Sequence, residues 1–104
     1  MLKLKETWKA ELHEILRHHA PEFEVWAYGS RVTGHAHDAS DLDLVLIHPK
    51  RSDIPCATLA ELKQALQESH LPISVDIMDW TRLPTEFHQQ INAHRVLLFP
   101  ASNP

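Results

Sequence analysis

The segment 41–47, DLDLVLI, constrains the fold more than any other part of this sequence. Successive side chains of a β-strand point to opposite faces, so Asp41 and Asp43 would share one face while the leucines occupy the other. Two carboxylates on one face repel each other, and burying them without a cation is costly. The segment therefore predicts a strand with one face in an apolar core and one acidic face that needs a positive partner.

Ahead of this strand lies a turn that suits a ligand. The segment 22–28, EFEVWAY, is rich in aromatic and β-branched residues and predicts a strand that ends at Gly29-Ser30. A short helix over 30–36 would follow, with backbone N–H groups and the serine hydroxyl at its start. Glycine lets a backbone approach a ligand closely, although Gly-Ser alone is a common turn pair. Together with the acidic strand, the turn predicts a cradle for phosphate groups.

A third acid follows in 73–79, ISVDIMD, which also predicts a strand. If this strand pairs with the acidic strand, the carboxylate of Asp76 joins those of Asp41 and Asp43. An all-oxygen set of this kind suits Mg²⁺, which takes waters and substrate phosphates as its other ligands. Asp79 lies three residues further on, would face the opposite way and stands nearer the strand end. We therefore prefer Asp76 and keep Asp79 as the alternative.

The remaining segments alternate between helix and strand patterns. Apolar residues recur at three- and four-residue spacing in the helical segments, and prolines or polar loops interrupt the chain between elements. The expected helices are 2–19, 30–36, 56–69 and 84–93, and the expected strands are 22–28, 41–47, 73–79 and 95–99, the last as a strand or edge piece. This order predicts the α/β (α+β) class, with a small mixed β-sheet packed against helices in a single domain over 1–104.

Composition narrows the classes of function. A formal net charge of −4 provides no general basic field for nucleic acid. The nine histidines and the single Cys56 have no spacing that would form a zinc site. One cysteine excludes an intrachain disulfide, no apolar run reaches the ~20 residues of a membrane span, and the N-terminal segment carries charges throughout. We therefore expect a cytoplasmic protein without nucleic-acid or membrane partners.

The stretch GSRVTGHAHDASDLDLVL, residues 29–46, resembles the signature of the DNA polymerase β-like nucleotidyltransferase superfamily. In that signature Gly-Ser is followed by ten residues and then by Asp-x-Asp, and this chain keeps the spacing without a gap. Arg31, Gly34 and Ser40, with the apolar residues after Asp43, are most similar to the minimal nucleotidyltransferase (MNT) branch. That branch includes antitoxins of HEPN/MNT modules and small subunits of two-component nucleotidyltransferases. The resemblance implies a polymerase β-like nucleotidyltransferase core.

The resemblance also implies a role for each carboxylate. Asp41 and Asp43 would bind the divalent metals, expected to be two Mg²⁺ ions, and through them the triphosphate. Asp76 would be the third carboxylate, on one metal and near the acceptor hydroxyl, where it could act as general base. All three acids are thus expected to be both catalytic and metal-binding.

The same resemblance assigns the turn to the nucleotide. Gly29 and Ser30 would contact the β- and γ-phosphates, with Arg31 in the same turn as a lesser nucleotide-binding candidate. The expected substrate is ATP, although no residue pattern here distinguishes ATP from the other nucleoside triphosphates.

The implied reaction is Mg²⁺-dependent transfer of AMP from ATP to a hydroxyl. For an MNT-type antitoxin the acceptor is a tyrosine of a cognate HEPN toxin, a helical protein encoded nearby. Two alternatives remain open: the catalytic subunit of a two-component small-molecule nucleotidyltransferase, whose pocket a separate helical subunit completes, and a non-catalytic subunit that masks a partner with the apolar residues 96–99. The acceptor and a homo- or hetero-oligomeric state are left undetermined.

Overall fold

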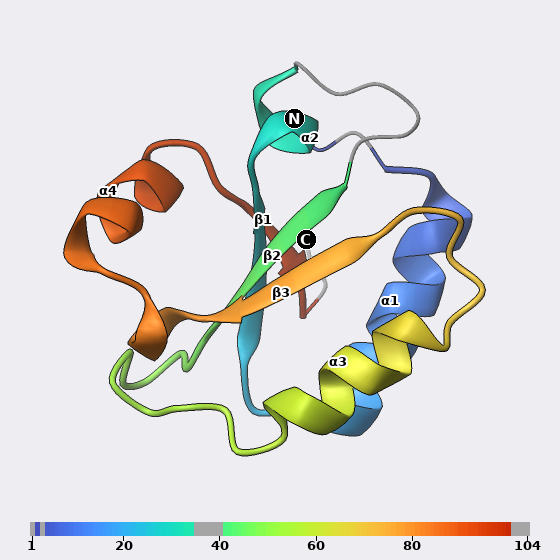
Figure 1. Ribbon diagram of the computed structural model, residues 1–104, viewed down its shortest axis with the longest axis horizontal. Helices are drawn as coiled ribbons and strands as arrows, with labels where there is room; N and C mark the ends of the chain where they lie inside the picture. Colours follow the sequence, from blue (N-terminus) through green and yellow to red (C-terminus); the bar gives the residue numbers. More distant parts are fainter. Residues whose placement is uncertain (1, 3, 35–40, 101–104) are drawn as a thin grey trace.

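A mixed sheet with helices on both faces forms the frame of the computed structural model, which describes residues 2, 4–34 and 41–100 (Figure 1). The elements follow one another as α1 (Glu6–His19), β1 (Glu24–Tyr28), α2 (Ser30–Thr33), β2 (Leu42–Ile47), α3 (Leu59–Gln67), β3 (Val75–Asp79), η1 (Trp80–Arg82), α4 (Thr85–Ala93) and β4 (Val96–Phe99). This alternation confirms the predicted α/β class.

The four strands lie side by side in the order β3-β2-β1-β4. β1 is antiparallel to both β2 and β4, whereas β2 and β3 are parallel. A parallel pair needs a crossover connection, and α3 provides it between β2 and β3. The mixed sheet is therefore confirmed, and β4 takes the edge position expected for residues 95–99.

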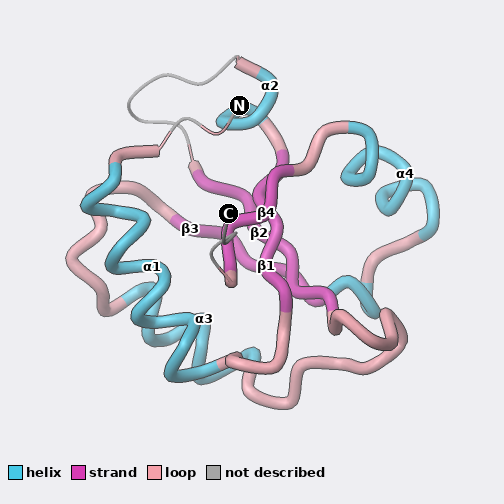
Figure 2. Tube along the Cα trace, turned by 180° about the vertical axis from the view of Figure 1, so that it is seen from behind, coloured by secondary structure: helices cyan, strands magenta, loops and turns pink. Residues whose placement is uncertain are grey.

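The two faces of the sheet carry different helices. α1 and α3 lie together over one face, which we call the core face (Figure 1; Figure 2). α4 lies over the opposite face, which we call the α4 face, and leaves part of it uncovered (Figure 1). The alternation along β2 sends Leu42, Leu44 and Leu46 to the core face and sends Val45 and Ile47 to the α4 face. One sheet thus supports two apolar layers.

The layer on the core face is the larger one. Leu12 and Leu16 of α1, Leu44 of β2 and Leu62 of α3 are all 0% exposed. Leu12 and Leu16 are four residues apart on α1, so they lie on one stripe of that helix and face the sheet. Burying each leucine stabilises the fold by roughly 1.5–3 kcal/mol. This layer fixes the strands from which the acidic side chains project.

Three helix starts differ from the sequence prediction, that of α4 by a single residue, since it begins at Thr85. α1 begins at Glu6 rather than at residue 2, because Lys5 has extended backbone angles, φ −66° and ψ 145°. α3 begins at Leu59 rather than at residue 56, with Thr58 as its N-cap. None of these differences moves the apolar stripe that each helix buries.

Two further features bear on the predicted segments. The short helix predicted over 30–36 is present as α2, and residues 35–40 lie outside the described part of the chain. The η1 turn depends on a side chain, because the Asp79 carboxylate accepts a hydrogen bond from the Thr81 N–H. Across the residues that the structure describes, no helix is both long and apolar enough to cross a membrane.

Candidate active site

Three polar side chains form a row across the α4 face at one end of the sheet. The register pairs Tyr28 of β1 with Asp43 of β2, and Asp43 with Asp76 of β3. Paired residues on neighbouring strands project from the same face, about 5 Å apart. The phenol and the two carboxylates are therefore neighbours, and the strand pairing on which the predicted acidic cluster depended is present.

Burial and the neighbouring acids raise the proton affinity of Asp43. Burial raises the pKa of the Asp43 carboxyl, and the charges of Asp76 and then Asp41 raise it further. Burial also raises the pKa of the Tyr28 phenol to about 12, with smaller contributions from Asp43 and Asp76. At neutral pH the phenol is therefore a protonated hydrogen-bond donor. A cation near Asp43 would relieve the repulsion between the carboxylates.

Gly29 brings the turn into direct contact with the acidic row. Its backbone has φ +83°, which L side chains rarely adopt, and a Cβ built there would overlap the Asp43 Oδ2 atom. The turn continues into α2 because the N–H groups of Val32 and Thr33 both donate to the Gly29 carbonyl, at 3.0 and 3.1 Å. Only glycine therefore satisfies both the backbone angle and the close approach to the carboxylate.

Ser30 and Arg31 take different positions in the turn. Ser30 is the first residue of α2 and is partly exposed. Arg31 is only 5% exposed, and its guanidinium lies over the Trp8 indole of α1, 5.7 Å from the ring centroid. A cation–π contact of this kind contributes on the order of 1 kcal/mol. Arg31 thus packs the turn against α1, whereas Ser30 stays accessible to a ligand.

The two acids of β3, Asp76 and Asp79, lie on opposite faces of the sheet and differ in exposure. Asp76 is exposed and lies beside Asp43 on the α4 face. Asp79 is 3% exposed on the core face, where it accepts hydrogen bonds from the Cys56 N–H at 2.9 Å, the Thr81 N–H at 3.0 Å and the Thr81 hydroxyl at 2.8 Å. Asp79 therefore organises the backbone between elements, and Asp76 is the acid that the structure brings to Asp43.

The described residues do not by themselves gather three metal ligands. Within the described residues, no group of three His, Cys, Asp or Glu side chains is arranged to hold a metal ion. The convergence of Asp41, Asp43 and Asp76 stays a prediction: Asp41 is exposed and precedes the start of β2, and its charge acts on Asp43. The donor chemistry of the Asp43–Asp76 pair still fits Mg²⁺, whose remaining ligands are waters and substrate phosphates in such sites.

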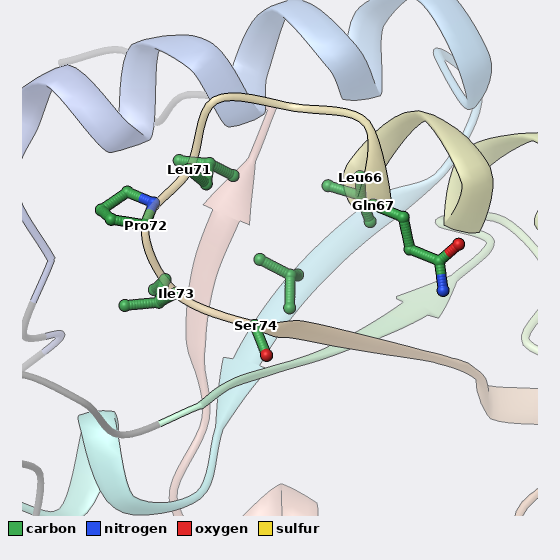
Figure 3. Close-up of a pocket in the computed structure, with 7 residues that line it drawn as sticks. Leu66, Gln67, Leu71, Pro72, Ile73 and Ser74 are labelled. Carbon is green, nitrogen blue, oxygen red and sulfur yellow. The ribbon is translucent and has the colours of Figure 1, made fainter.

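A small cavity adjoins this row, and two larger ones lie elsewhere. The small one, about 260 Å³, lies between the end of β1, α2 and α4, and Gly29 is part of its wall. A cavity of about 440 Å³ is formed by the end of α3 and the segment that leads into β3, from Leu66 to Val75 (Figure 3). Another, of about 400 Å³, is lined by residues including His19, Phe23 and His48. None of the predicted site residues lines either of the larger cavities.

Sequence reasoning did not single out Tyr28 or the α4 residues near it. The Phe87 ring meets the Tyr28 ring edge-on, with centroids 5.8 Å apart and an interplanar angle of 89°. The alternation of EVWAY already places Tyr28 on the same face as Trp26, which was the available signal. On the same face of the sheet, the Trp80 indole stacks on the His88 ring, with centroids 3.7 Å apart.

The apolar C-terminal segment forms β4 and is largely used within the fold. Leu98 and Phe99 are 4% and 8% exposed, and the strand pairs with β1. Val96 and Leu97 are partly exposed, so only half of the segment could contribute to the apolar surface on which a purely masking subunit would depend.

Comparisons with known proteins agree with this fold. Residues 10–103 match the family described as Polymerase beta, Nucleotidyltransferase. A relative from Haemophilus influenzae, the "Probable protein adenylyltransferase MntA", is 39% identical over 99 residues, which cover 93% of this chain and 83% of the relative.

Solved structures share the fold. A crystal structure of a toxin-antitoxin with AMP-PNP superposes with a TM-score of 0.69 at 24% identity, over 90% of this chain and 74% of that chain. The crystal structure of the toxin-antitoxin MntA-HepT superposes with a TM-score of 0.65 at 21% identity, over 93% of this chain and 74% of that chain.

Proposed function

Because this chain belongs to the polymerase β nucleotidyltransferase family, we propose that it is an antitoxin that transfers AMP from ATP to a hydroxyl of a HEPN toxin. The contact between the turn and the acidic row carries the proposal: the Gly29 backbone lies against Asp43, and Asp76 lies beside Asp43. Phosphates held at this turn would lie within reach of both carboxylates. The name of the H. influenzae relative and the AMP-PNP in a toxin-antitoxin of the same fold support this direction.

Each predicted site residue has a role in the proposal. Ser30 and the Gly29 backbone bind the β- and γ-phosphates, and Arg31 holds the turn in position from its contact with Trp8. Asp43, Asp76 and the exposed Asp41 would hold two Mg²⁺ ions together with the phosphate oxygens. When bound, these ions neutralise negative charge on the triphosphate and help to orient the reacting oxygens.

The chemistry is a displacement at the α-phosphorus. The acceptor oxygen forms a bond to the α-phosphorus, the bond to the bridging oxygen of the β-phosphate breaks, and pyrophosphate leaves with that electron pair. The hydroxyl proton passes to Asp76, which is exposed and therefore accessible to an acceptor. The protonated Tyr28 phenol next to Asp43 is available to donate a hydrogen bond to the nucleotide or to that carboxylate.

The proposed acceptor is a tyrosine on the toxin, which is encoded beside this chain. The toxin-antitoxin MntA-HepT shares this fold and supports a two-protein arrangement. We place the reaction in the cytoplasm, in keeping with the single cysteine and the ATP requirement.

The experiment incubates the purified chain with α-labelled ATP, Mg²⁺ and the helical protein encoded nearby. We expect label on a toxin tyrosine, located by mass spectrometry, and release of pyrophosphate. Asp43→Asn should lower the transfer rate about 10³-fold, a loss of about 4 kcal/mol of transition-state stabilisation.

The matched control is Asp53→Asn. Asp53 is an exposed aspartate outside the site, paired with Arg51 at 2.8 Å, and its substitution should leave the rate within about twofold. Transfer by the Asp43→Asn variant at the wild-type rate, or no transfer by the wild type, contradicts the proposal. Label on a small molecule but not on the toxin would instead support the two-component alternative.

A further inference from the structure

The cavity between the turn and α4 is positioned for a further part of the nucleotide. We infer that it binds the base of the donor nucleotide and that Gln90 selects adenine. This inference rests on the proposed nucleotidyl transfer and specifies the base, which the sequence left open. The walls of the cavity come from β1, α2 and α4, and they include Tyr28, Gly29, Phe87, Gln90 and His94.

The first argument is continuity with the acidic row. Gly29 borders the cavity and also lies against the Asp43 carboxylate, so one residue separates the two spaces. An α-phosphate held near Asp43 would therefore be only a ribose away from a base in the cavity. The β- and γ-phosphates would then follow the turn to Ser30, which does not line the cavity.

The second argument is the size and shape of the cavity. Its volume of about 260 Å³ lies just below the ~300–1,000 Å³ of pockets that enclose drug-sized ligands. It therefore suits a single base, with ribose and phosphates outside. The rings of Phe87 and Tyr28 meet edge to face, with centroids 5.8 Å apart, and give the cavity an aromatic wall. Any of the nucleotide bases can stack on an aromatic ring.

The third argument is the polar group at its rim. Gln90 is exposed on α4 and lines the cavity. A glutamine amide offers one acceptor and two donors, and it pairs in a bidentate way with N6 and N7 of adenine. Guanine presents an acceptor at the position of the adenine amino group, so the same amide discriminates between the two purines.

The neighbouring residue on α4 provides a matched control. Gln89 is exposed on the same helix but does not line the cavity. Replacing either glutamine by leucine keeps helix propensity and removes the same amide. The pair Gln90→Leu and Gln89→Leu therefore separates loss of the cavity contact from loss of a surface amide.

The test is equilibrium binding of ATP, GTP and inorganic tripolyphosphate to the full chain with Mg²⁺, by isothermal titration. We expect the wild type to prefer ATP over GTP. Gln90→Leu should lower this preference about tenfold, whereas Gln89→Leu should leave it unchanged. Phe87→Leu should weaken the binding of both ATP and GTP about five- to tenfold. None of the variants should change tripolyphosphate binding.

The outcomes separate this inference from the function on which it rests. If the wild type binds ATP but does not distinguish it from GTP, or if both glutamine variants behave alike, the base assignment is overturned while nucleotidyl transfer stands. If the wild type binds neither ATP nor tripolyphosphate, the proposed function fails as well. Thermal unfolding of each variant checks that a loss of binding does not come from a loss of folding.

Discussion

The two faces of the sheet are built from the same strands and have opposite characters. On the core face, Leu42 and Leu44 are 0% exposed and pack beneath α1 and α3. On the α4 face, Asp43 follows directly after Leu42 and lies beside Asp76 and Tyr28. Burial of apolar side chains on the core face stabilises the fold, whereas the α4 face carries two neighbouring carboxylates. Because neighbouring residues of a strand point in opposite directions, a single rigid strand can provide both.

The two aspartates of β3 show the same difference at the scale of single residues. Asp79 is buried on the core face and accepts three hydrogen bonds, so its charge is compensated within the fold. Asp76 is exposed on the α4 face, where its near neighbour is another acid. A buried acid with several donors is structural, whereas an exposed acid beside a second acid is available for a ligand.

The largest effect on stability is expected at Asp79. Asp79→Ala removes a buried acceptor and leaves the N–H groups of Cys56 and Thr81 without it, so the free energy of unfolding should fall by about 3 kcal/mol. Asp76→Ala should change it by less than about 0.5 kcal/mol, since this side chain is exposed. Urea denaturation measures both. Equal effects would show that the two faces do not differ as described.

An intermediate effect is expected at Gly29, with Gly34 as a matched glycine. Both have positive φ, +83° and +90°, so alanine at either site should cost about 1–2 kcal/mol in backbone strain. Only at Gly29 would the new Cβ displace the Asp43 carboxylate, because no atom of the described residues lies within 4 Å of a Cβ built at Gly34. Gly29→Ala should therefore also weaken ATP binding about tenfold, measured by titration. Similar nucleotide affinities of the two variants would argue against the close approach as a functional feature.

The smallest effect is the pH dependence that Asp43 gives to stability. The pKa of Asp43 is raised in the folded protein, so the native state binds this proton more tightly than the unfolded chain does. Stability therefore falls as the pH rises from the ordinary value of 3.8 through the raised pKa, and the loss is complete above it. Asp43→Asn should be more stable than the wild type at neutral pH, by less than about 1 kcal/mol because solvent screens the half-buried carboxyl.

Unfolding in urea across the range from about pH 7 to pH 4 tests this prediction. The advantage of Asp43→Asn should shrink as the pH falls and disappear in acid. The variant would then be inactive yet more stable, a combination expected only when the acid is retained for function. An advantage that grows toward low pH would show that the sign is wrong.

Much of the frame could be predicted because it depends on local patterns. The alternation in DLDLVLI and EFEVWAY predicted both strands and their faces, and the helix stripes of α1 and α3 were predicted to within a few residues. The spacing from Gly29-Ser30 to Asp43 predicted the neighbourhood of turn and acid, which the structure shows as a direct contact. These features depend on side-chain periodicity and turn chemistry, which act over short distances along the chain.

Other features depended on contacts between distant segments. The position of Asp79 among the donors of Cys56 and Thr81 involves a residue 23 positions away, which no local pattern predicts. The exposed position of Asp41 depends on β2 starting one residue later, where the Leu42 N–H donates to the carbonyl of Ser74, just before β3. The contact of Arg31 with Trp8 and that of Phe87 with Tyr28 likewise required the packing of helices on the sheet.

The sequence by itself determined the element types, the acidic face of β2 and the turn before it, because periodicity and glycine conformation are properties of short segments. Tertiary structure paired Asp43 with Asp76, the acid that strand alternation had favoured, and it alone decided what Arg31 contacts and where α4 closes a cavity beside Gly29. Strand register and helix docking decide these points. They are set by the burial of apolar surface over the whole molecule, and a short stretch of sequence does not contain that information.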